Sequence, residues 1–197
     1  MENITTCLKN YIKKKLNKNF LQFLFVVITV LLIFSTLFFT GCVKKETVKL
    51  YFAKYEDNSS FLVFEYRDVV KDENFYKTVI EELIKGPKDE QLYPTIPSST
   101  KVYSVKVKDG LAIVDFSKEI ITDTSKIPHS STTEILAIFS IVNTLTEFDE
   151  IQKVRITIEG KKEGKIDDLY IEDFWGHVGI YEDFTRNEQV LLKNQTE

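Results

Sequence analysis

Cysteine is nearly absent from this chain of 197 residues, which contains only Cys7 and Cys42. Both precede residue 43, so the 155 residues that follow offer no thiol for a disulfide or a thiolate metal site. Histidine is equally scarce: His129 and His177 are the only two, and neither has a second histidine at ligand spacing. We therefore expect a domain that is stabilised by its apolar core and that holds no metal or other cofactor.

Positive charge is also in deficit. The whole chain has a formal net charge of −4, and residues 43–197 alone carry 21 Lys and Arg against 29 Asp and Glu, a net charge of −8. An acidic domain is a poor candidate for binding nucleic acid, because the phosphates would repel it. This part of the chain also lacks the Gly-x-Ser-x-Gly, P-loop and dinucleotide-binding motifs. We therefore expect no nucleic-acid partner and no enzymatic activity.

Long apolar runs are confined to one stretch, residues 20–39, which contains no charged residue. In the segment before it, five lysines outnumber the single acid, Glu2. The run ends in Phe39-Thr40-Gly41-Cys42. A basic head, an apolar run and a stop of small residues are typical of an export signal. We therefore expect everything after Cys42 to lie on the outer face of the cell membrane.

Two fates of this run remain open. Its 20 residues would form a helix about 30 Å long, which matches a bilayer core, so the run could stay as a transmembrane anchor with the lysines on the cytoplasmic side. Alternatively, Phe39-Thr40-Gly41-Cys42 resembles a bacterial lipobox, in which the chain is cleaved before a cysteine that carries lipid. We predict lipid attachment at Cys42, with residues 1–42 as signal or anchor, 43–47 as a tether, 48–184 as the domain and 185–197 as a polar tail.

Hydrophobic periodicity predicts a β-hairpin and a helix at the start of the domain. Alternation over residues 48–53 and 61–67 indicates the two strands of the hairpin. The next apolar stripe, over residues 75–84, has helical spacing. Asp72 is the expected N-cap of this helix, and Gly86-Pro87 is its expected end.

A second hairpin, over residues 101–116, has the clearest register. Its centre, Asp109-Gly110, suits a two-residue turn with positive φ at both positions. The pairs predicted on the inner face are Val107 with Ala112, Val105 with Val114 and Tyr103 with Phe116. Those predicted on the outer face are Lys106 with Ile113 and Ser104 with Asp115.

A second helix and a last strand complete the predicted domain. Ser131-Thr132-Thr133-Glu134 fits a capping box that opens the helix, and Phe139 is expected to be buried on it. Residues 152–159 alternate again and predict the strand. The order ββα-ββα-β, which could reflect an internal repeat, favours an α+β domain: a largely antiparallel sheet with two helices on one face.

Five segments of the domain carry a family resemblance: residues 48–52, 92–97, 110–117, 141–145 and 154–161. In this order they resemble the GerMN domain, the sporulation and spore germination domain, from about residue 48 to residue 184. The resemblance implies an α/β domain related to ring-building modules of sporulation complexes. It also implies a membrane-attached lipoprotein of Gram-positive, spore-forming bacteria. The family has no established catalytic activity, so the resemblance implies no catalytic residues.

The sequence departs from the family pattern in two places. Ser99 stands where the loop often has glycine, which alters that turn. Residues 163–175 are longer than usual before Gly176-His177. This second departure affects how the last strand attaches, and we expect any difference in partner to arise there.

Two surfaces are candidates for recognition. The outer face of the Asp109-Gly110 hairpin mixes basic and aliphatic side chains and is the preferred contact surface for an envelope or sporulation protein; its residues are Lys106, Lys108, Leu111 and Ile113. A second cluster sets carboxylates beside an aromatic ring and could bind or hydrolyse cell-wall glycan; its residues are Glu172, Asp173, Trp175 and His177. Plainer interpretations are a sheet face that is solvated or covered by the C-terminal segment, and a solvated acidic loop.

We thus predict a membrane-tethered, non-catalytic module on the outer face of the cell membrane. It would act in sporulation or spore germination through protein–protein interaction or assembly. The alternatives are a lipoprotein that binds peptidoglycan and, less expected because no acid/base pair can be identified, a wall hydrolase.

Overall fold

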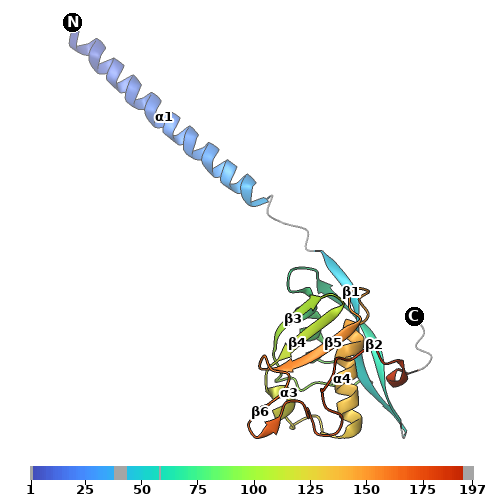
Figure 1. The fold of residues 1–197 in the computed structure, drawn as a ribbon. Helices are drawn as coiled ribbons and strands as arrows, with labels where there is room; N and C mark the ends of the chain where they lie inside the picture. Colours follow the sequence, from blue (N-terminus) through green and yellow to red (C-terminus); the bar gives the residue numbers. More distant parts are fainter. Residues whose placement is uncertain (1, 38–43, 58, 193–197) are drawn as a thin grey trace. The chain divides into compact units, whose positions relative to one another are not determined.

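The computed structural model describes residues 2–37, 44–57 and 59–192, and the chain divides into two units, Met1–Val43 and Lys44–Glu197. The first unit contains helix α1 (Glu2–Leu37) and the second is the folded domain (Figure 1). In the stretches that the structure describes, no helix combines the length and the apolar character needed to cross a membrane. Cys42, the predicted site of lipid attachment, lies outside the described residues.

The domain has the predicted order ββα-ββα-β, which confirms the α+β class. Its first ββα segment consists of β1 (Lys45–Glu56), β2 (Ser59–Val70) and α2 (Phe75–Ile84). The second consists of β3 (Val102–Lys108), β4 (Leu111–Phe116), the short α3 (Glu119–Thr122), α4 (Ser131–Leu145) and β5 (Lys153–Ile158). A small hairpin of β6 (Lys165–Ile166) and β7 (Leu169–Tyr170) and a 3-10 turn, η1 (Glu188–Val190), follow.

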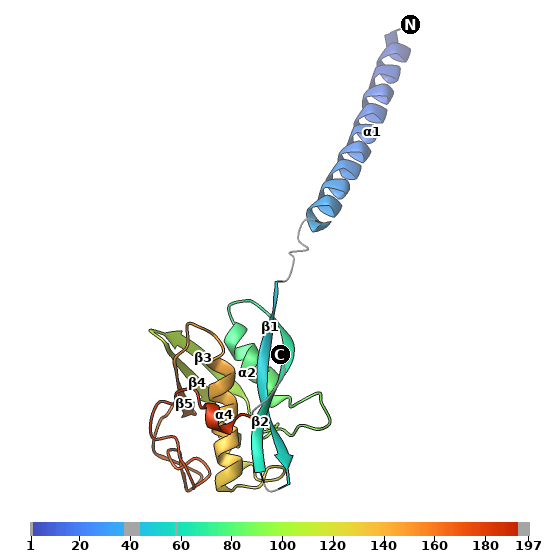
Figure 2. The same cartoon turned by 90° about the vertical axis from the view of Figure 1, so that its right-hand side faces the viewer.

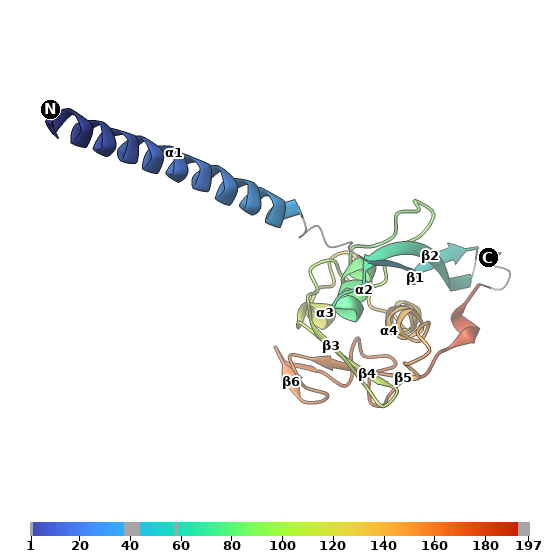
Figure 3. The ribbon, with the colours of Figure 1, turned by 90° about the horizontal axis from the view of Figure 1, so that it is seen from above.

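These strands form two main sheets with the helices between them, whereas the sequence predicted both helices on one face of a single sheet. The antiparallel ribbon β1–β2 lies on one side of α2 and α4, and the three-stranded sheet β3–β4–β5 lies on the other (Figures 2 and 3). Strands β4 and β5 are parallel. A parallel pair needs a crossover connection, and α4 supplies it. Residues 50–53 of β1 are buried consecutively, because side chains on both faces of the ribbon pack against the domain.

The Asp109-Gly110 turn has φ angles of 49° and 80°, as its two residues predict. Four of the five predicted pairs of this hairpin are present, but the pair Tyr103–Phe116 is wrong. A β-bulge places Val102 opposite Phe116 instead. The bulge buries the apolar Val102 and leaves Tyr103 exposed, where its hydroxyl donates to Glu159 Oε1 at 3.1 Å.

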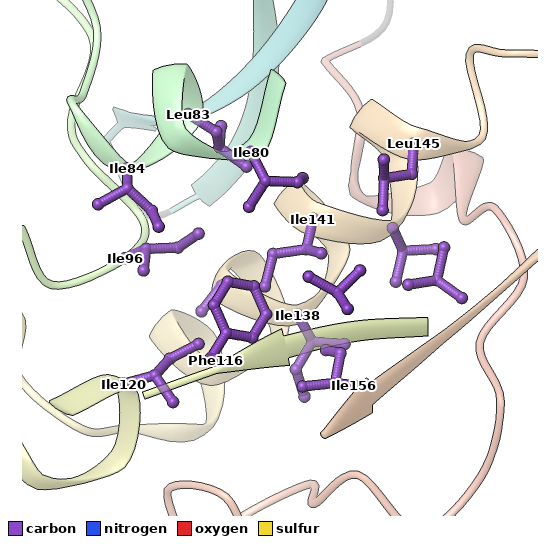
Figure 4. Packing of buried hydrophobic residues seen from close by; sticks show 14 of the residues in the cluster. Ile80, Leu83, Ile84, Ile96, Phe116, Ile120, Ile138, Ile141, Leu145 and Ile156 are labelled. Atoms are coloured by element: carbon purple, nitrogen blue, oxygen red, sulfur yellow. The ribbon is translucent and has the colours of Figure 1, made fainter. Parts of the chain in front are cut away.

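One apolar core fills the space between the sheets (Figure 4). Helix α4 is buried over most of its surface and contributes Ile138 and Ile141 to the core; α2 contributes Ile80 and Leu83, and the inner face of the three-stranded sheet contributes Phe116 and Ile156. The prediction that Phe139 is buried is wrong, because this side chain is only partly buried. It faces the C-terminal segment, where its ring meets Phe184 edge-on at a centroid distance of 5.8 Å.

The predicted helix caps differ from the observed ones. Helix α4 has Ser130 as its N-cap: Ser130 Oγ accepts from the Thr133 N–H, and Thr133 Oγ1 accepts from the Ser130 N–H. Helix α2 begins after Asn74, whose side chain makes no capping bond. Asp72, the predicted cap, instead accepts from the Asn74 N–H through its carboxylate. Each cap was misplaced because neighbouring polar residues fit the same pattern.

Glu134, which was predicted to be part of the capping box, is fully buried and holds the C-terminal segment. Its Oε1 accepts from the backbone N–H groups of Trp175 at 3.4 Å, Val178 at 3.1 Å and Gly179 at 2.8 Å. Its Oε2 accepts from the His177 N–H at 2.9 Å. A buried carboxylate is tolerated when it is hydrogen-bonded in this way. Glu134 therefore fixes residues 175–179 on α4.

Residues 171–192, which we call the C-terminal strap, continue across the domain. Asn143 on α4 makes two hydrogen bonds of 2.9 Å with the backbone of Asn187, one as donor and one as acceptor. Phe184 forms a bridge with Val154 at the free edge of β5. Part of the predicted polar tail is therefore packed on the domain.

We expect Glu134→Gln to lower the free energy of unfolding by about 2–4 kcal/mol, because a buried amide replaces a charged acceptor and points its NH₂ group at backbone donors. Urea titration followed by the fluorescence of Trp175, the single tryptophan, measures this loss. Glu90→Gln removes an exposed carboxylate and should change stability by less than about 0.5 kcal/mol. Equal effects of the two substitutions would contradict this role of Glu134.

Candidate interaction surface

The preferred candidate surface lies on the outer face of the three-stranded sheet. Strand pairing sets Lys108, Leu111 and Lys153 in one row across the sheet. It sets Lys106, Ile113 and Arg155 in the next row. The residues of β4 that alternate with Leu111 and Ile113, namely Ala112 and Val114, point into the core. We call the two rows the basic face: Lys106, Lys108, Leu111, Ile113, Lys153 and Arg155.

Solvent reaches the basic face. The side chains of Lys106, Lys108 and Lys153 are exposed, and those of Leu111 and Ile113 are half-buried. In the part of the chain that the structure describes, none of these three lysines forms an ion pair. The four residues that the sequence singled out are therefore neighbours on one accessible surface, joined by two basic residues of β5.

Arg155 differs from the lysines because it has an acidic partner. Its Nε and Nη2 donate to the two carboxylate oxygens of Asp183 at 2.6 and 2.7 Å. This bidentate pair holds the pKa of Asp183 below its usual range. Asp183 belongs to the C-terminal strap, so the strap reaches the margin of the basic face and leaves the lysines uncovered.

Polar residues end the basic face on the side away from the turn. In the next row, Asp115 Oδ1 accepts from the Thr157 hydroxyl at 2.9 Å and from the Gly160 N–H at 2.7 Å. Beyond it, Glu159 accepts from the Lys118 N–H at 2.9 Å. These carboxylates stabilise turns of the domain, and they place negative charge beside the basic face.

The aromatic ring of the second candidate cluster is buried. Trp175 is 7% exposed and stacks on His129 with a centroid distance of 4.3 Å and an angle of 6° between the rings. Its Nε1 donates to the Ile120 carbonyl at 2.8 Å. The same burial lowers the pKa of His129. A ring in this position is not available to stack on a sugar from solvent.

The two carboxylates of that cluster are used by the fold, and the side chain of His177 is exposed. Glu172 accepts from the Gly164 N–H at 2.9 Å, and Asp173 accepts from the hydroxyl of Tyr181, whose pKa this bond raises. The backbone of His177 is bonded to Glu134. Over the described residues, histidines and carboxylates do not form a group of three or more that could hold a metal ion.

Sequence reasoning missed a polar network under the strap. The Tyr51 hydroxyl donates to Glu147 Oε1 at 2.6 Å and accepts from Arg186 Nη2 at 2.9 Å. Burial and the bond to Glu147 raise the pKa of Tyr51. The three members of this network come from distant parts of the sequence and belong to common residue types, so no local sequence pattern indicates the network. Lys153 and Arg155 were missed as members of the basic face because periodicity does not show which strand lies beside β4.

The domain is similar to known proteins in both sequence and structure. The sequence model of the Germane family, described as "Sporulation and spore germination", matches residues 49–164. The spore germination protein GerM of Bacillus subtilis (strain 168) is 30% identical over 109 residues, which are 53% of this chain and 28% of GerM. The chain therefore spans less than a third of that relative.

Two solved structures are similar to the domain. The tandem GerMN domains of the sporulation protein GerM from Bacillus subtilis match with a TM-score of 0.58 and 25% identity, over 78% of this chain and 50% of that one. The first GerMN domain of the same protein matches with a TM-score of 0.53 and 25% identity, over 72% of this chain and 98% of that one. The family match runs through β5 and includes the basic face, while the C-terminal strap lies beyond it. This chain belongs to the Germane family of sporulation and spore germination proteins.

Proposed function

We propose that this chain is a membrane-tethered, non-catalytic module that acts in sporulation or spore germination by binding another protein outside the membrane. Membership of the Germane family supports the process. The basic face carries the proposed mode of action. It presents four basic side chains and two aliphatic ones in a domain whose net charge is −8. Charge of one sign gathered against the overall charge of a domain favours recognition of a complementary surface.

The surroundings of the polar groups support a role without catalysis. An active site normally pairs a nucleophile or base with a group that tunes it, in a pocket open to substrate. Here Glu134 is fully buried and bonded to backbone N–H groups, and His129 is stacked on Trp175. The carboxylates of the second cluster stabilise turns. These groups are committed to structure, which favours surface recognition over glycan hydrolysis.

The apolar run of residues 20–39 and the cysteine behind it support the tether. Either an acyl group on Cys42 or the uncleaved apolar run in the bilayer would hold the domain on the outer face of the cell membrane. A module held in this way meets partners that share the same membrane or the adjacent wall.

The contact surface is tested by the double substitution Lys106→Glu with Ile113→Asp in the producing organism. We expect sporulation or germination efficiency and crosslinking to a partner to fall at least about tenfold, since a loss of about 1.4 kcal/mol in binding corresponds to that factor. The matched control is Lys88→Glu with Leu169→Asp, which makes the same charge change at exposed residues elsewhere. A silent face variant, or an equal effect of the control, would refute this contact surface.

The tether is tested at Cys42. We expect wild-type protein to incorporate an alkyne-labelled fatty acid, and Cys42→Ala to incorporate none and to keep the 41 residues before position 42. Cys7→Ala is the matched control and should be labelled like wild type. Mass spectrometry of membrane fractions measures both products. Wild-type protein that retains Met1 and no lipid would show that residues 20–39 are an uncleaved anchor.

A further inference from the structure

The arrangement of the basic face indicates the chemistry of its partner. We propose that this face binds an amphipathic helix of another protein, one whose apolar stripe is flanked by acidic residues on both sides. The inference rests on the proposed function, because it takes the basic face as the contact surface and names what fits there.

The width of the basic face matches a helix. Adjacent strands lie about 4.8 Å apart, so the cations of β3 and β5 stand roughly 10 Å from each other on either side of β4. An α-helix with its side chains is about 10–12 Å across. A helix lying along β4 would set its stripe on Leu111 and Ile113. Its two flanks would lie over the lysines of β3 and the basic residues of β5.

The spacing along β4 also matches. Leu111 and Ile113 point to the same side and stand about 7 Å apart along the strand. Residues i and i+4 of an α-helix lie about 6 Å apart along the helix axis, so two successive residues of its apolar stripe can each meet one of them. The inner face of this sheet is already covered by α2 and α4, and a helix on the outer face would give a layered arrangement common in mixed folds.

The sign of the partner follows from the charges on this face. Four basic side chains line it; Asp183 at its margin forms an ion pair with Arg155, whereas Lys106, Lys108 and Lys153 form none among the described residues. Lysines on β3 and β5 stand on both sides of the aliphatic pair, so carboxylates are required on both flanks of the helix. The lysine stems would add apolar contact beside Leu111 and Ile113.

Other ways of using this region are less compatible with its residues. Addition of a strand to the edge of β3 is opposed by the bulge at Tyr103 and by the lysines on this edge strand. An anionic membrane surface is broad, and it would meet the acidic remainder of the domain as well as the basic face. A helix covers a strip only about 10–12 Å wide, which includes the cations on both sides of β4.

The experiment uses the full chain in phosphatidylcholine nanodiscs and two labelled helical peptides. One has leucines at i, i+4 and i+7 flanked by glutamates, and the other has lysine in place of every glutamate. Fluorescence anisotropy should show that wild-type protein binds the acidic peptide at least about tenfold more tightly, weakening as salt rises. Lys106→Glu with Lys108→Glu should remove the preference, because it reverses both exposed cations of β3 while the basic residues of β5 and the core stay intact.

Lys88→Glu with Lys126→Glu is the matched control, since it reverses two exposed lysines elsewhere and should bind like wild type. Equal binding of both peptides by wild-type protein, or an equal loss in the control, would overturn the proposal. Binding of phosphatidylglycerol vesicles that depends on Lys106 and Lys108, without binding of the acidic peptide, would overturn it in favour of a lipid surface.

The test separates this inference from the proposed function. If Lys106→Glu with Ile113→Asp impairs sporulation but the acidic peptide does not bind, the contact surface stands and the helical partner is refuted. If the peptide binds but that variant is silent in cells, the peptide chemistry stands and the proposed function is refuted.

Discussion

The buried carboxylate of Glu134 is the interaction on which much of the domain's outer surface depends. A charge with no solvent exposure is costly, and it is stabilised here because four backbone N–H groups of one segment converge on it. The dependence is mutual. Those N–H groups lie in an irregular segment that offers them no helix or sheet partner, and buried backbone donors must be paired. Helix α4 and residues 175–179 therefore form as one unit.

The C-terminal strap, which Glu134 holds on α4, determines which surfaces of the domain remain accessible to a partner. It buries Trp175 against His129, and its carboxylates accept hydrogen bonds within the domain: Glu172 from the Gly164 N–H and Asp173 from the Tyr181 hydroxyl. Further on, Phe184 pairs with Val154 at the edge of β5, which protects one edge of the three-stranded sheet. The strap thus converts the cluster that most resembled a ligand site into structure and leaves the outer face of the sheet open.

The sequence predicted interactions between residues close together in the chain better than interactions between distant ones. Asp109-Gly110 correctly predicted a turn and most of a hairpin register, because that information lies within sixteen residues. The bulge at Tyr103 was missed because burial of Val102 in the core overrides simple alternation.

Glu134 fits a capping box locally, and nothing near it indicates that its partners lie about 40 residues later. The division into two sheets was missed for the same reason: alternation shows that a strand has a buried face but not which strand lies beside it. The candidate surface was therefore half predicted, since Lys106 and Ile113 share a hairpin, whereas Lys153 and Arg155 join them only through the parallel pairing of β5 with β4.

Charge segregation then bears on selectivity as well as affinity. Exposed charges act over about 8–10 Å at physiological ionic strength, so the basic face attracts a carboxylate that touches it although the domain as a whole is acidic. At longer range the net charge of −8 opposes the approach of extended polyanions, including nucleic acid and anionic membranes. Asp115 and Glu159 place this opposition beside the face itself, because Asp115 lies in the next row of the sheet, Glu159 follows the end of β5, and both are already bonded within the domain. A partner that lies along β4 must therefore be acidic over the two basic rows and must carry no carboxylate where it passes Asp115. Across the sheet, an element about as wide as one helix can contact the cations of β3 and β5 together, which links the charge pattern of the sheet to the partner that the basic face selects.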